Sequence, residues 1–410
     1  MSFVSLLRRE PRALAFGFLY TAAATVGQTF LISLFLPGIK ASLELDDAAI
    51  SLLFTLATLA SAAALWKLGA WIDRGDLLRY ALSCAILLAV SCALIAASTV
   101  IAALAAGLFC LRLAGNGLLT HVAVTATARH FSGDRGRALA IVLLGTSLGE
   151  GLLPAALVPL IGAWGWRWAL LALGCLGLGF ATVGAHIVRR QAQFRRPMSR
   201  ASDLSPAPLE HTRPERERSD RRYFVLTAPL FAAMWMFITA AIFHQALVAE
   251  AKGVSLQWFA VSFVAFAAVR VPVSVLTGRM IDRIGSAWLF CLHLAPLAVG
   301  TVALIVVDSA WVAPVYWLCA GITSGMGAVV QSTVVAERVP RERLGTARSI
   351  LGAAGIVASA AGPSLYGYAL AAGAGVAAIL WASVAFFVAA TALGVIAPRS
   401  EARPRRGRTN

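Results

Sequence analysis

The chain has 410 residues, of which 59% are apolar and only 13% are charged, and its mean hydropathy is +0.79. A soluble domain carries roughly 25% charged residues, so the composition excludes a soluble globular protein. The net charge of +16 raises the question of nucleic-acid binding, but the sequence contains no folded reader module that would use it.

Apolar runs of about 20 residues, each long enough to cross the hydrocarbon core of a bilayer, recur along almost the whole chain. The runs are continuous and exceed the length of a barrel strand, so only helices fit. The first run is too long for a cleavable signal peptide, and we expect it to remain as a span. The twelve predicted spans are residues 13–37, 48–71, 77–98, 100–126, 138–162, 166–188, 223–248, 254–277, 286–307, 309–333, 346–371 and 374–397.

A polar segment rich in proline and arginine separates the first six spans from the last six. Residues 189–222 contain too few apolar side chains to fold alone, and we expect them to form a flexible linker. The predicted fold is an all-α integral membrane protein of twelve transmembrane helices in two pseudo-symmetric bundles. Its parts are an N-terminal six-helix bundle (1–188), the linker (189–222), a C-terminal six-helix bundle (223–398) and a basic tail (399–410).

The basic residues are distributed unevenly between the two sides of the predicted membrane protein. Most of the 35 Lys and Arg residues fall in the termini, the linker and the loops of one side, whereas the other side's loops hold only Lys40, Arg167 and Lys252. Cytoplasmic loops carry the excess of positive charge, so both termini are expected in the cytoplasm. We therefore predict a multi-pass protein of a bacterial inner membrane, with the lipid bilayer and not nucleic acid as its partner.

One charged turn occurs in each half of the chain, at a constant offset. The offset also relates Arg129 to Arg338 and Pro154 to Pro363, which is typical of a duplicated membrane bundle. An acidic side chain and an arginine at helix ends can pair across a gap in one state and separate in another. These turns are therefore predicted to form a cytoplasmic latch. The latch residues are Gly69, Asp73 and Arg74 in the first copy and Gly278, Asp282 and Arg283 in the second.

The two Gly-x-x-x-Asp-Arg turns resemble the signature loop of the major facilitator superfamily. Residues 112–117 are similar to the superfamily's second motif, and residues 129–138 with 165–168 resemble its monocarboxylate and oxalate/formate branch. The resemblance covers residues 12–398. It implies two six-helix halves that alternate access to a central cavity and run on ion or substrate gradients. The chain agrees with this in lacking a phosphate-binding Gly-x-x-x-x-Gly-Lys-Ser/Thr motif.

Three ionisable residues are predicted to lie inside the membrane, where each costs on the order of 3 kcal/mol and marks a functional candidate. A rise of about 1.5 Å per residue places Arg270 about 18 Å, Glu150 about 20 Å and Arg112 about 25 Å from the cytoplasmic ends of their spans. The planar guanidinium of Arg270 suits a substrate carboxylate. Oxalate/formate-type carriers also have a basic residue on this span.

Glu150 is the predicted proton-coupling residue, because burial favours the protonated form of a carboxyl group. In the alternative interpretation, Glu150 and Arg112 or Arg270 simply neutralise each other. Arg112, Gln28 and Asn116 join Arg270 as predicted substrate-binding residues, although interhelical hydrogen bonding explains Gln28 and Asn116 equally well.

The predicted function is secondary transport: proton-coupled movement of a small organic anion, a monocarboxylate or dicarboxylate, by alternating access. Gly145-x-x-x-Gly149-Glu150 partly resembles a drug-antiporter motif, and the alternative is an efflux pump for amphipathic or drug-like compounds. Glu150 stands where that motif has proline, and the glycines also suit close helix packing.

The sequence contains no nucleophile triad, cofactor motif or Cys spacing typical of a metal site, so we expect neither an enzyme nor a bound cofactor or metal. The carrier is expected to act as a monomer on a small molecule and H⁺.

Overall fold

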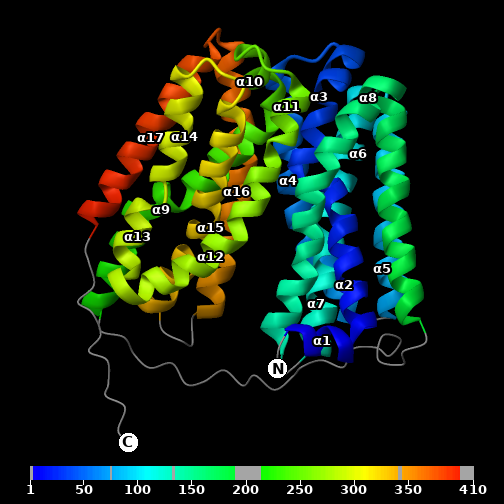
Figure 1. The fold of residues 1–410 in the computed structure, drawn as a ribbon, viewed down its shortest axis with the longest axis horizontal. Coiled ribbons are helices and arrows are strands. Elements are labelled where there is room, and N and C mark those ends of the chain that lie inside the picture. Colours follow the sequence, from blue (N-terminus) through cyan, green and yellow to red (C-terminus); the bar gives the residue numbers. More distant parts are fainter. Residues whose placement is uncertain (1–2, 74–75, 132–133, 190–213, 340–343, 398–410) are drawn as a thin grey trace, which may run out of the picture.

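The computed structural model describes residues 3–73, 76–131, 134–189, 214–339 and 344–397, and within these ranges it contains helices and no strand. Figure 1 shows the helices as two bundles side by side, the first half of the chain (blue to green) in one and the second half (green to red) in the other. The described residues include 11 helices that are long and apolar enough to cross a membrane.

One of these helices, residues 136–188, has 53 residues, and Gly165 interrupts it with a φ of 78° and a ψ of 158°. A backbone with positive φ suits glycine and reverses the chain here, so this helix makes two crossings. The break lies between the predicted spans 138–162 and 166–188. The expected all-helical, twelve-span architecture is therefore confirmed.

The N-terminal half begins with a short helix that precedes the first span, and several of its spans are divided. Its elements are α1 (Phe3–Arg9), α2 (Pro11–Ala24), η1 (Thr25–Gly27), α3 (Thr29–Leu43), α4 (Asp47–Gly69), η2 (Ala70–Asp73), α5 (Leu77–Ala96), α6 (Ile101–Leu111), η3 (Arg112–Leu119), α7 (Thr120–His130) and α8 (Arg135–Val188).

The C-terminal half repeats this plan. Its elements are α9 (Pro214–Phe243), α10 (Gln245–Ala251), α11 (Leu256–Val261), α12 (Phe263–Ile284), α13 (Ser286–Leu292), α14 (Ala295–Val306), α15 (Val312–Arg338), α16 (Leu344–Ala371) and α17 (Val376–Ile396). The helix α9 begins inside the predicted linker 189–222. Proline suits the first helical position, and acidic residues follow it, so a helix can start there. Residues 190–213 and 398–410 lie outside the described residues.

Small residues allow the helices of the first bundle to approach closely. α2 packs on α8, and a Cβ on Gly145 would collide with the Phe18 carbonyl of α2. A Cβ on Gly149 would lie 2.5 Å from the Thr25 side chain. Close packing of the Gly145-x-x-x-Gly149 segment, one of the two interpretations of this motif, is thus confirmed.

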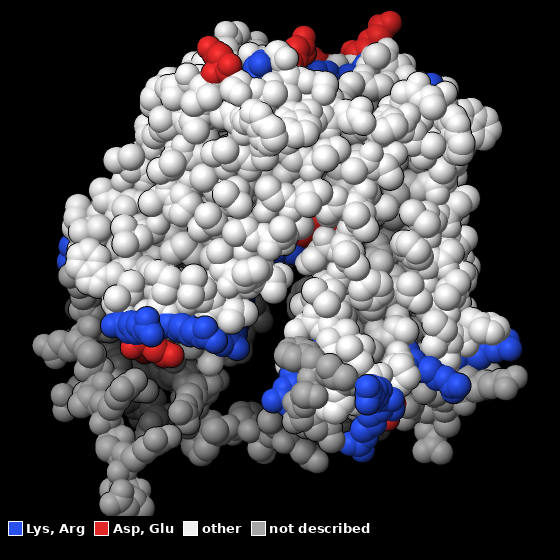
Figure 2. All heavy atoms as spheres, in the orientation of Figure 1, with Lys and Arg blue, Asp and Glu red and all other residues white. Residues whose placement is uncertain are grey.

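The two halves meet along α4 with α16 and along α8 with α11 and α12. Figure 2 shows Lys and Arg gathered at one end of the molecule, where a gap separates the halves, while Asp and Glu predominate at the other. We call the first the basic end; its exposed arginines include Arg8, Arg79, Arg137 and Arg279. At the opposite end, a hydrogen bond from the Lys252 ammonium at 2.8 Å lowers the pKa of the exposed Asp308 carboxyl.

Candidate functional site

The first span is broken in the middle. The sequence predicts one continuous helix over 13–37, but α2 ends at Ala24 and α3 begins at Thr29, with Gln28 between them in an extended conformation (φ −82°, ψ 150°). The break brings the Gly27 backbone against the π-helical turn η3, where a Cβ on Gly27 would lie 2.7 Å from Gly115 Cα. Broken helices within the membrane line binding sites in many transporters.

Arg112 lies at this break and satisfies the backbone there. Its Nη1 donates to the Gly27 carbonyl at 2.8 Å, its Nε donates to Thr58 Oγ1 at 3.1 Å, and its guanidinium lies over the Phe54 ring. Arg112 is buried, and no carboxylate in the described part of the chain pairs with it. The arginine therefore stabilises the broken helix and also leaves a positive charge inside the N-terminal bundle.

Replacing Arg112 by Ala should destabilise the protein, because the Gly27 carbonyl would be left without a donor inside the bundle. A buried unpaired polar group costs about 1–3 kcal/mol of unfolding free energy. Thermal unfolding of the purified protein would measure this loss, and Thr58→Val, which removes one hydrogen bond, should have a smaller effect. An Arg112→Ala protein with unchanged stability and impaired transport would contradict the structural role and favour substrate contact.

The other two predicted polar residues flank the same break. Gln28 is half-buried at the start of α3, and Asn116 is half-buried in η3 beside Gly115. η1 and η3 are in contact, so the structure brings Gln28, Asn116 and Arg112 into one region of the N-terminal bundle.

Arg270 and Glu150 form an ion pair that joins the two halves. Arg270 Nη1 donates to Glu150 Oε1 at 3.1 Å, and Nη2 lies 2.8 Å from Oε2. Glu150 comes from α8 and Arg270 from α12, and their side chains are 10% and 27% exposed. The interpretation in which these two charges neutralise each other describes this conformation.

Neighbouring residues hold the pair in place. The Arg270 guanidinium lies over the Phe266 ring, 5.4 Å from its centroid, one turn earlier on α12. Ser274 Oγ donates to the Arg270 carbonyl at 2.9 Å and lies 3.1 Å from the Gly325 carbonyl, which ties α12 to α15. On the other side, Gly149 packs on Thr25 of η1. Glu150 therefore lies next to the broken first span, on which Arg112 also acts.

The latch residues are only partly described. Gly69 ends α4 close to the His121 ring, and Asp73 ends η2, but the side chain of Asp73 and the whole of Arg74 lie outside the described residues. In the second copy, Asp282 and Arg283 are exposed at the end of α12 and form no ion pair with another described residue. The latch remains a prediction, and its second copy is disengaged from the described residues here.

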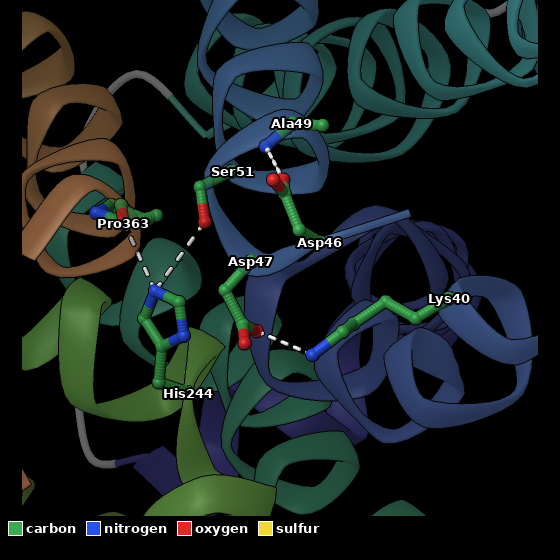
Figure 3. Close-up of polar contacts among 7 residues, drawn as sticks. All are labelled: Lys40, Asp46, Asp47, Ala49, Ser51, His244 and Pro363. Carbon is green, nitrogen blue, oxygen red and sulfur yellow. Dashed lines mark hydrogen bonds and ion pairs between the residues drawn. The ribbon is translucent and has the colours of Figure 1, made fainter. Parts of the chain in front are cut away.

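A polar seam closes the two halves against each other at the end opposite the basic end. We call it the closed seam and define it as Ser51, Thr55, His244, Pro363 and Ser364. Figure 3 shows the part of it in which His244 lies between Ser51 and Pro363. His244 Nε2 lies 3.0 Å from the Pro363 carbonyl and 3.4 Å from Ser51 Oγ, and Thr55 Oγ1 lies 2.7 Å from Ser364 Oγ.

The closed seam was not part of the sequence prediction. Its hydrogen-bonding side chains are ordinary polar residues, and they come together only because α16 and His244 contact α4. A lone histidine and scattered hydroxyl groups carry no such signal in the sequence.

The architecture is that of a carrier, with two bundles, broken spans and an ion pair between the bundles. Comparison with known proteins identifies the family. The Major Facilitator Superfamily model matches residues 17–273 and 223–410. The chain belongs to the major facilitator superfamily. Members of the superfamily are transporters, so this chain is a multi-pass membrane transporter of a small molecule and not an enzyme. No curated protein matches the chain in sequence.

Solved structures of the superfamily share the fold at low sequence identity. A bacterial homolog of the human lysosomal transporter Spinster, in an inward-facing and unoccupied conformation, is 17% identical with a TM-score of 0.70, covering 95% of this chain and 96% of its own. The nucleoside transporter NupG is 12% identical with a TM-score of 0.75, covering 95% of this chain and 100% of its own. These likenesses establish the major facilitator fold and leave the substrate open.

Proposed function

We propose that this transporter moves a small organic anion, a monocarboxylate or dicarboxylate, together with a proton by alternating access. The observation that carries the proposal is the Arg270–Glu150 ion pair, which places a titratable carboxylate on an arginine between the two halves. The branch resemblance of residues 129–138 and 165–168 points to the same class of substrate.

The pair gives a physical route to coupling. While Glu150 is ionised, it occupies the Arg270 guanidinium, and a substrate carboxylate must compete with it. A proton on Glu150 removes the competing charge and frees the planar fork of Arg270 for bidentate binding of the substrate. Anion and proton then enter the site together, so no additional net charge is buried, which would be expensive inside a membrane.

Arg112, Gln28 and Asn116 are proposed to complete the substrate site from the N-terminal bundle. Arg112 has no carboxylate partner among the described residues, so its charge attracts an anion towards the broken span. The start of α3 adds the positive end of a helix dipole in the same region. We infer that one anionic substrate bridges the bundles between this region and Arg270.

The basic end is proposed to face the cytoplasm of a bacterium, with the chain in the inner membrane and acting as a monomer. The excess of Arg at that end supports this orientation by the positive-inside rule. Movement between states would then close the gap at the basic end, engage the Asp282–Arg283 latch and its first copy, and open the closed seam.

Replacing Glu150 by Gln tests the coupling directly, because the amide resembles the protonated acid and cannot lose a proton. In the wild type, uptake of a labelled monocarboxylate should rise by up to about tenfold per unit fall in pH where Glu150 is ionised. In Glu150→Gln, uptake into proteoliposomes should lose this dependence, while counterflow exchange continues. An unchanged pH profile would remove Glu150 from the coupling role.

Export of amphipathic or drug-like compounds is the second candidate, and one observation favours it. The C-terminal bundle contains a crevice of about 790 Å³ between α9, α15 and α16, and its described lining is apolar apart from Arg221. Pockets of this size and character suit apolar ligands. Failure to take up or exchange any labelled carboxylate, together with drug resistance on expression, would favour this alternative.

A further inference from the structure

We propose that the crevice between α9, α15 and α16 binds the hydrocarbon chain of a single-chain anionic amphiphile of the fatty-acid class. The site is distinct from the proposed anion site, since neither Arg270 nor Glu150 lines it. The proposal concerns binding, and it stands or falls independently of the coupling mechanism.

The crevice forms because α9 and α16 touch at one level and diverge towards the basic end. A Cβ on Gly362 would collide with the Met236 carbonyl, so the two helices are in contact there. Two turns nearer the basic end, a Cβ on Gly355 would meet only the Trp235 ring, at 3.5 Å or more. Beyond it, small side chains such as Ala354 line the space and leave it open.

The corresponding place in the first bundle is filled. The constant offset between the halves relates Gly145 to Ala354, and Gly145 is pressed so closely on α2 that a Cβ would strike the Phe18 carbonyl. The fold therefore does not require a void at this position. An unfilled apolar cavity forfeits dispersion contacts along its walls, so an apolar occupant stabilises this conformation.

The walls of the crevice suit a hydrocarbon chain. Trp235 contributes an indole ring whose Nε1 donates to Gln331 Oε1 at 3.4 Å, so its polar edge is already satisfied. Gln331 is itself buried and donates to the Phe231 carbonyl at 3.2 Å. Val225 and Ile350 are each 65% exposed, although they are large and apolar. An apolar ligand would bury these exposed apolar side chains, which is favourable.

The charged residue in the described lining of the crevice is an arginine. Arg221 is that residue, and the exposed Arg222 and Arg348 are sequence neighbours of lining residues. Glu337 is an exposed acid near the end of α15. It accepts a hydrogen bond from Ser286 on α13, so its carboxylate already has a partner. A carboxylate head group at the basic end would pair with the arginines, while its chain extends along α9 towards Trp235.

The volume favours one chain over two. At about 30 Å³ for each water- or methylene-sized group, the crevice holds roughly 26 such groups. A single chain of twelve to sixteen carbons with its head group fits within that space, whereas two sixteen-carbon chains of a phospholipid exceed it. The volume therefore suits a single-chain anion lying wholly within the crevice, and this is the occupant proposed.

Photolabelling of the full-length protein in phosphatidylcholine nanodiscs tests the site. A dodecanoic acid that carries a diazirine at its chain end should label residues 225–235 and 347–355, as located by peptide mass spectrometry. Excess dodecanoate should suppress this labelling by about tenfold or more, while dodecanol, with the same chain and no charge, should compete more weakly. Arg221→Gln should remove the difference between the acid and the alcohol.

Two variants fill the crevice, and a third variant is the matched control. Gly355→Leu and Ala228→Leu place a branched side chain in the space and should each reduce labelling by about tenfold, whereas Gly352→Leu, on the same helix with nothing within 4 Å of its Cβ, should not. Melting temperatures confirm that each variant is folded. Labelling that persists in both filled variants would overturn the proposal. So would displacement by phosphatidylglycerol as effective as by dodecanoate, since it would identify a bilayer lipid.

Arg270→Ala separates this site from the transport mechanism. The variant lacks the proposed anion site, yet its photolabelling should equal that of the wild type because Arg270 does not line the crevice. Loss of labelling in Arg270→Ala would show that the amphiphile binds at the central pair, which would also overturn the separate site.

Discussion

Replacing Arg270 by Ala should reduce uptake of an organic anion by roughly 30-fold or more, because losing one partner of a buried charged contact costs about 2–5 kcal/mol and about 1.4 kcal/mol is a factor of ten. Arg270→Lys should retain partial activity at most, since an ammonium cannot reproduce the planar fork that Arg270 presents to Glu150. Initial rates of labelled monocarboxylate uptake into proteoliposomes, at saturating and limiting substrate, measure both effects.

Arg270→Ala also leaves the buried Glu150 without its partner, and a broken buried pair destabilises a protein by about 3–5 kcal/mol. The double variant Arg270→Ala/Glu150→Ala removes both charges and should recover the melting temperature without recovering transport. Arg279→Ala is the matched control, because this arginine is exposed on the same helix at the basic end. Normal transport in either variant that lacks Arg270 would show that the anion site lies elsewhere.

The depth of the charged residues within the membrane could be predicted from the sequence. The helical rise predicts about 18 Å of depth for Arg270 and about 20 Å for Glu150, and the 2.8 Å contact between them confirms that they share one level. The length of the apolar runs likewise predicts every span, because hydrocarbon thickness sets the number of residues needed to cross it.

The direction in which a side chain faces could not be predicted from the sequence. Rotating a helix by half a turn would leave its composition and depth unchanged, so the sequence could propose Arg112 for the substrate site without indicating that its Nε and Nη1 donate to Thr58 and Gly27. The break at Gln28 could not be predicted from the sequence either. It depends on contact between the glycine backbones of η1 and η3, which belong to different spans.

Contacts between the halves are unequal at the two ends, which defines the conformation that the structure represents. The closed seam joins α4 to α16 and to His244, which follows α9, at one end, while Figure 2 shows a gap at the basic end. Alternating access requires the seam to open when the gap closes. A change that disfavours only the closed seam should therefore shift the population of states without touching the Arg270–Glu150 pair.

Gly367→Val is that change. A Cβ on Gly367 would lie 2.6 Å from both the Asp47 carbonyl and Ser51 Oγ, so a branched side chain there cannot be accommodated while the seam is closed. Overpacking of this kind costs about 1–3 kcal/mol, which corresponds to a shift of roughly 5- to 150-fold between two states. Uptake should fall because the state open at the basic end becomes rare.

The shift is measured at Ser51, which is fully buried in the closed seam. A membrane-impermeant maleimide, added on the side opposite the basic end, should label Ser51→Cys much faster when Gly367→Val is also present, and comparing the two proteins cancels labelling of the native cysteines. Gly352→Val is the control, because α16 has open space around that position. If Gly367→Val leaves both labelling and uptake unchanged, the seam does not close one end of the transport pathway, and the gap at the basic end is not one half of an alternating pair.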